Sequence, residues 1–71
     1  MANVAYSVWI TEDLETRVDP PNAYRKAIAI AKLAAREHKK QVRITVSDSD
    51  TKEPLDRYLT VEPDGTVTEH N

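Results

Sequence analysis

The chain has 71 residues, a formal net charge of −2, 31% charged and 39% hydrophobic residues, and no cysteine. This length suits a single domain, residues 1–71, and such a domain buries only about 60% of the surface that its unfolded chain exposes. Without cysteine there is no disulfide, thiolate zinc site or cysteine nucleophile, and for so short a domain this favours a reducing, cytoplasmic compartment.

The first predicted element is a strand over residues 4–10, rich in β-branched and aromatic residues. It lacks a basic leader and is far shorter than the roughly 20 residues that a membrane span needs, so we expect neither a signal peptide nor a membrane anchor. Residues 14–18 fit a short return strand, which the sequence leaves open. Asp19-Pro20-Pro21 ends this region, because prolines lack the amide donor that a central strand requires.

The second predicted element is a helix over about residues 22–39, where nothing in the sequence breaks a helix. Asn22 or Asp19 is placed to cap its first turn. One stripe of this helix consists mostly of small residues, which let the helix axis approach a sheet closely: Tyr24, Ala27, Ile28, Ala31, Ala34, Ala35 and His38. Beside it, Ala29, Ile30 and Leu33 form a lesser apolar strip, which is either the margin of the core or a dimer seam.

Three further strands are predicted after the helix, over residues 41–47, 57–62 and 66–70. Strict alternation directs one set of side chains inward: Val42, Ile44, Val46, Leu59, Val61 and Val67. Residues 48–54 form a polar connection. Pro63-Asp64-Gly65 predicts a hairpin turn in which the only glycine takes a positive φ.

The order of strand, optional strand, helix and three strands predicts an α+β fold. We expect a two-layer sandwich in which one helix packs on a four- or five-stranded, mainly antiparallel sheet and leaves the other face open. The alanine-rich helix, the alternating strand and the late Asp-Gly turn together resemble several small prokaryotic and phage proteins. This resemblance implies a prokaryotic or phage origin, names no family and carries over no functional residue.

The helix-free face of the predicted sheet is the first candidate site. Its side chains are Trp9, Arg43, Thr45, Tyr58 and Thr60, with Thr68 beside them. Trp, Tyr and Arg dominate protein-binding hot spots, whereas four aromatic residues in the whole chain are few for a platform that stacks on nucleic-acid bases. The alternative is that Trp9 sits at a sheet edge, partly covered by a loop. We therefore predict a non-enzymatic protein-interaction module that acts through the open face or an edge strand, alone or as a homodimer.

A basic stretch is the second candidate, since residues 22–43 hold seven basic residues and one acidic residue. Four of the cations share one side of the predicted helix: Arg25, Lys32, Arg36 and Lys39. Such a row can follow phosphates or meet an acidic partner, which makes nucleic-acid binding the second hypothesis. The simpler interpretation is a solvated helix face that balances nearby acids, because the chain is acidic overall.

Catalytic signatures are missing from the sequence. A single glycine excludes both the phosphate-binding loop and the dinucleotide fingerprint, and no serine has the glycines of a nucleophile elbow. A small hydrolase or metal-dependent enzyme remains a third hypothesis. We expect no catalytic residue and no cofactor.

Two segments have partial metal-site character. Residues 48–53 begin like a calcium loop, but Lys52 and Glu53 stand where a ligand and a glycine are needed, and Leu59 stands where the bidentate glutamate belongs. Glu37-His38 and Glu69-His70 could converge at one end of the domain. Two histidines without thiolates seldom hold a structural metal, so we expect none.

Overall fold

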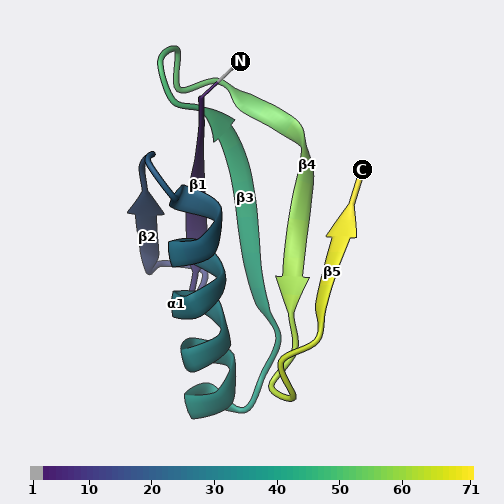
Figure 1. Cartoon of the computed structure of the whole chain (residues 1–71). Helices are drawn as coiled ribbons and strands as arrows, with labels where there is room; N and C mark the ends of the chain where they lie inside the picture. The colour runs from purple at the N-terminus through teal and green to yellow at the C-terminus, as the bar shows by residue number, and fades with distance from the viewer. Residues whose placement is uncertain (1–2) are drawn as a thin grey trace.

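The computed structural model describes residues 3–71 and places one helix on one face of a five-stranded sheet (Figure 1). In chain order the elements are β1 (Val4–Trp9), β2 (Glu15–Val18), α1 (Ala23–His38), β3 (Val42–Asp48), β4 (Pro54–Val61) and β5 (Val67–His70). The spatial order is β2-β1-β3-β4-β5, and every neighbouring pair is antiparallel. The predicted α+β sandwich is confirmed, including the strand over 14–18 that the sequence left open.

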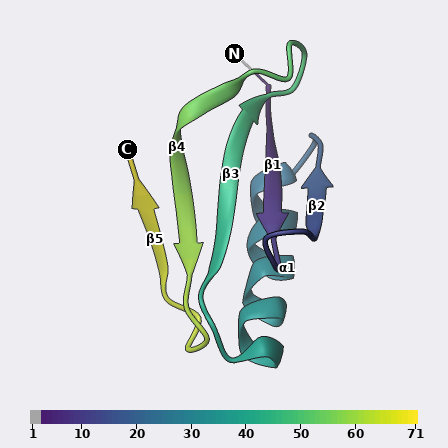
Figure 2. The ribbon, with the colours of Figure 1, turned by 180° about the vertical axis from the view of Figure 1, so that it is seen from behind.

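The helix lies over only part of the sheet. Because β2 and β3 both pair with β1, the β2-α1-β3 connection carries α1 across β1. The helix contacts β1, β3, β2 and β4, but within residues 3–71 it has no contact with β5 (Figures 1 and 2). The described part of the chain contains no helix that is long and apolar enough to cross a membrane.

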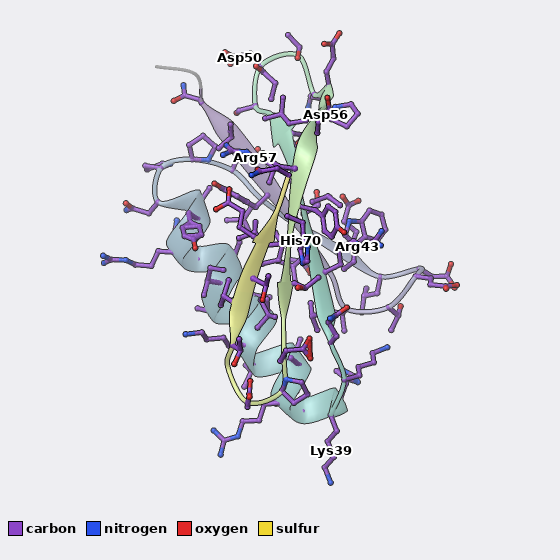
Figure 3. All side chains as sticks on the ribbon, turned by 90° about the vertical axis from the view of Figure 1, so that its right-hand side faces the viewer. Lys39, Arg43, Asp50, Asp56, Arg57 and His70 are labelled. Atoms are coloured by element: carbon purple, nitrogen blue, oxygen red, sulfur yellow. The ribbon has the colours of Figure 1, made fainter. Side chains whose placement is uncertain are left out.

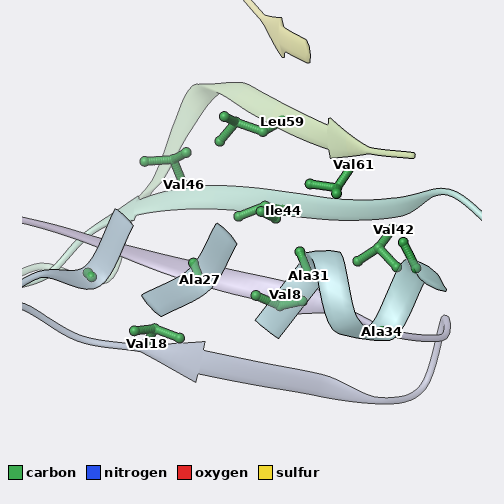
Figure 4. Packing of buried hydrophobic residues seen from close by; sticks show 12 residues of the cluster. Val8, Val18, Ala27, Ala31, Ala34, Val42, Ile44, Val46, Leu59 and Val61 are labelled. Atoms are coloured by element: carbon green, nitrogen blue, oxygen red, sulfur yellow. The ribbon is translucent and has the colours of Figure 1, made fainter. Parts of the chain in front are cut away.

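The core forms between the alanine stripe of α1 and the inward-facing residues of the sheet (Figure 4). Its buried members are Val8, Val18, Ala23, Ala27, Ala31, Ala34, Ala35, Val42, Ile44, Val46, Leu59 and Val61. All six inward predictions for β3, β4 and β5 are confirmed, with Val67 half-buried against this cluster. Tyr24 and His38, the end members of the stripe, are exposed. Small side chains on α1 therefore bring the helix close to larger aliphatic residues of the sheet.

The helix begins without a side-chain cap. Asn22 occupies the N-cap position in the left-handed conformation, with φ of 61°, and its side chain makes no capping hydrogen bond. Asp19 instead accepts a hydrogen bond from Arg17 Nε at 3.0 Å. The prediction that either residue caps the first turn is wrong. At the other end, Lys39 also takes a positive φ, and its N–H donates to the Ala35 carbonyl.

The strand β4 begins earlier than predicted, at Pro54 instead of Arg57. Thr45 pairs with Tyr58, whereas Ser47 pairs with Pro54, so the register shifts between these positions. The shift is a bulge in which β4 carries extra residues near its start. The predicted hairpin turn after β4 is confirmed by Gly65, which has φ of 96°.

Candidate functional site

The side chains that face away from α1 form two rows across the sheet, as the strand register shows. One row runs through Trp9, Arg43, Thr60 and Thr68, and the next runs through Ser7, Thr45, Tyr58 and His70. Residues directly opposite each other on paired strands share a face, so the structure brings all five predicted residues together. Figure 2 shows this face with the helix behind it. We call it the open face.

Trp9 is half-buried on the open face, at the end of β1. Its indole Nε1 donates a hydrogen bond of 2.9 Å to Thr45 Oγ1 on the neighbouring strand. Since β1 lies between β2 and β3, the alternative that placed Trp9 at a sheet edge is wrong. The indole is therefore oriented by β3 and stays clear of the helix.

Tyr58 is the centre of a second cluster and is 37% exposed. The guanidinium carbon of Arg43 lies 5.2 Å from the Tyr58 ring centroid, and the His70 imidazole stacks on that ring at 4.6 Å with 11° between the planes. Arg43 comes from β3 and His70 from β5, the two neighbours of β4 (Figure 3). Arg43 forms no ion pair within residues 3–71. Its hydrogen-bond donors remain available to a partner.

Thr60 lies on the open face but is only 7% exposed. Its Oγ1 is 3.0 Å from His70 Nε2. Thr60 therefore supports the cluster from below and does not offer a contact surface, unlike the other predicted residues. His70 is the residue that the sequence interpretation missed. Alternation along the strand could have placed His70 on the same face as Thr68. Its stacking on Tyr58 could not be predicted in this way, because it depends on the pairing of β4 with β5.

Two open hollows flank Trp9 and Thr45. One, of about 500 Å³, lies beside Trp9 between residues 10–12 and 40–43. The other, of about 490 Å³, lies between β2, β3 and the start of β4. Charged residues of both signs line them: Glu12, Lys40, Arg43, Glu15, Arg17, Lys52, Asp56 and Arg57. An aromatic centre with a mixed-charge rim is the usual arrangement of a protein–protein interface.

The second candidate surface lies on the opposite layer. Arg25, Lys32, Arg36 and Lys39 are all exposed on or just after α1. The ion pairs of the described chain are Arg17–Asp19 at 3.0 Å and Arg57–Glu69 at 3.8 Å, so none of these four cations has an acidic partner there. The helix face thus carries positive charge that direct ion pairs do not neutralise.

Glu37-His38 and Glu69-His70 do not converge at one end of the domain (Figure 1). The first pair lies at the C-terminal end of α1 and the second at the end of β5, and these ends point in opposite directions in Figure 1. Among residues 3–71, no group of three or more His, Cys, Asp or Glu side chains could hold a metal ion. In the calcium-like loop, Asp48 Oδ1 instead accepts hydrogen bonds from the amides of Asp50 and Thr51.

Comparison with protein-family models, with curated proteins and with solved structures gives no match to this chain. The candidate surfaces therefore stand on their geometry and charge.

Proposed function

We propose that this protein is a small, non-enzymatic interaction module that binds a protein partner through the open face. The observation that carries the proposal is the ordered cluster of Trp9, Arg43 and Tyr58, each held by a neighbour within the sheet. Trp, Tyr and Arg are the residue types that contribute most to protein-binding hot spots. Side chains that are already oriented lose less conformational entropy on binding, which raises affinity.

The chemistry of the open face indicates what the partner surface should carry. The indole of Trp9, which lines one hollow, suits contact with an apolar side chain. The Arg43 guanidinium suits a carboxylate, because it has no ion-pair partner within the described residues. We therefore expect a partner that presents an apolar residue next to an acidic one.

The test compares wild type with Arg43→Ala and with Lys32→Ala, a matched cation on the helix layer. A tagged chain is used to capture partners from its native cell, and the captured protein is then purified. We expect wild type and Lys32→Ala to bind it equally, and Arg43→Ala to bind at least about 30-fold more weakly, as for a hot-spot residue. Since Trp9 is the only tryptophan, its emission should shift on binding if the partner lacks tryptophan. Equal affinity of Arg43→Ala and wild type would contradict the proposal.

Nucleic-acid binding through α1 is the second candidate function, favoured by the four exposed cations without ion pairs. Here Arg25→Ala and Lys32→Ala should weaken binding to labelled DNA or RNA, and Arg43→Ala should not. Affinity should also fall steeply with salt, because phosphate contacts release counterions. No measurable binding at low salt would discard this candidate.

A further inference from the structure

The two edges of the sheet differ in how well they are protected. The edge strand β2 (Glu15–Val18) contacts α1 and is followed directly by Asp19-Pro20-Pro21. Charged residues, prolines and coverage by another element are the devices that keep an edge strand from pairing with another chain. The edge strand β5 contains no proline and has no contact with α1 within residues 3–71.

The backbone groups that β5 leaves free follow from its hairpin. The amide of Glu62 donates to the Thr66 carbonyl at 2.9 Å, which makes these two residues a hydrogen-bonded pair. In an antiparallel ladder such pairs alternate with non-hydrogen-bonded ones. Thr68 and His70 therefore direct their backbone groups towards β4. Val67 and Glu69 direct theirs to the free edge.

This edge is also held in a fixed shape. His70 stacks on Tyr58, and its Nε2 is within hydrogen-bond distance of Thr60, so the last residue of β5 is anchored. Glu69 points to the helix side, where an inward charge would normally discourage pairing, but it lies 3.8 Å from Arg57. The charge that would protect the edge is thereby partly neutralised.

From these observations we infer that β5 pairs with β5 of a second copy of this chain, antiparallel and about a two-fold axis at Thr68. In this register Val67 lies opposite Glu69 of the second copy, and Thr68 lies opposite its own equivalent. No like charges face each other in this register. The backbone groups of Val67 and Glu69 that point to the free edge all find hydrogen-bond partners in the second copy. Because β2 is protected, each copy has one open edge, so association ends at a closed dimer and does not continue into a fibre.

The dimer has a functional consequence, although the inference itself depends only on the edge and not on the proposed function. A two-fold axis perpendicular to the joined sheets places both helices on one side and both open faces on the other. Two Trp9–Arg43–Tyr58 clusters then lie on one continuous surface. A repetitive or dimeric partner would bind with higher avidity than a single cluster provides.

Glu69→Pro tests the pairing, since proline removes an amide that β4 does not use. Glu69→Gln is the matched control, because it removes the same charge and keeps the amide. Sedimentation equilibrium from micromolar to millimolar protein should show a dimer for wild type and for Glu69→Gln. The dimer of Glu69→Pro should be at least about tenfold weaker, because symmetry removes two hydrogen bonds per dimer. A wild type that stays monomeric over this range, or a Glu69→Pro dimer as tight as wild type, would overturn the inference.

A second measurement does not depend on whether the proline variant folds. In a mixture of isotope-labelled and unlabelled wild type, NMR should detect an intermolecular contact between the Hα atoms of the two Thr68 residues, which face each other as a non-hydrogen-bonded pair. A dimer without this contact uses another surface and refutes the pairing. Arg43→Ala should leave the dimer dissociation constant unchanged. The β5 pairing and the proposed partner binding through the open face can therefore be refuted independently of each other.

Discussion

The imidazole of His70 stacks on the ring of Tyr58 at 4.6 Å and so links the edge of the sheet to the open face. Tyr58 in turn lies under the guanidinium of Arg43, 5.2 Å from the ring centroid. A single side chain of β5 thus orders both the strand that we propose pairs with a second copy and the aromatic ring that we propose contacts a partner.

Replacing His70 should therefore loosen β5 as well as the open face. We expect His70→Ala to lower the free energy of unfolding by about 1–2 kcal/mol, because it removes the stacking and leaves the buried Thr60 hydroxyl without its partner. Urea unfolding followed by Trp9 fluorescence measures the change. Thr68→Ala, an exposed position on the same strand and face, is the control. Equal destabilisation by the two variants would show that the stacking adds nothing to stability.

The bond between Trp9 and Thr45 can be isolated by a double-mutant cycle. Trp9→Phe removes the donor, and Thr45→Val removes the acceptor at nearly constant shape. We expect a coupling free energy of about 0.5–1.5 kcal/mol, which is typical of a partly buried hydrogen bond. Urea unfolding followed by far-UV circular dichroism measures all four proteins. Additive effects would mean that the indole is not held by β3 in solution.

The fold could be predicted because its signals are local. Alternation in residues 41–47 fixes which side of β3 is buried, and the alanine periodicity of residues 23–38 fixes the buried side of α1. Each pattern lies within one element, so the predicted buried side stays the same when the predicted ends of the element are wrong by a residue or two. The predicted start of β4 was wrong because a proline such as Pro54 usually indicates the end of a strand. In the structure Pro54 pairs with Ser47, and a bulge accommodates it.

The composition of the open face was also predictable, but its internal contacts were not. Alternation alone places Trp9 and Tyr58 on the side away from the helix. The burial of Thr60 and the stacking of His70 depend on the register between β4 and β5, which neighbouring residues in the chain do not determine. The separation of Glu37-His38 from Glu69-His70 was not predictable either, because it follows from the directions in which α1 and β5 run.

The close approach of α1 to the sheet makes a prediction about helix substitutions. Ala31 is fully buried in the cluster with Val8 and Ile44 (Figure 4). We expect Ala31→Leu to destabilise the protein by about 1–3 kcal/mol, because the added volume must push the helix from the sheet. Ala29→Leu is the matched control on the exposed side of α1 and should change stability by less than about 0.5 kcal/mol. Similar thermal unfolding midpoints for the two variants would contradict this packing.

The carboxylates of Asp48 and Asp64, both at turns, make the stability of the fold depend on pH. Hydrogen bonds from the amides of Thr51 and Asp50 hold the pKa of Asp48 below its usual value of 3.8, and the amide of Thr66 does the same for Asp64. The folded state thus binds protons more weakly than the unfolded state. The stability that these groups contribute is complete above about pH 4 and is lost as the pH falls through their lowered pKa values.

Urea unfolding at a series of pH values from neutral to strongly acidic tests this dependence. In the double variant Asp48→Asn/Asp64→Asn, each amide oxygen still accepts hydrogen bonds but no longer titrates. We expect its stability to fall less steeply than that of wild type below about pH 4. Asp50→Asn is the control, because the Asp50 carboxylate accepts no hydrogen bond within residues 3–71. If the double variant follows the wild-type curve at every pH, the two turns do not stabilise the folded state through these charges.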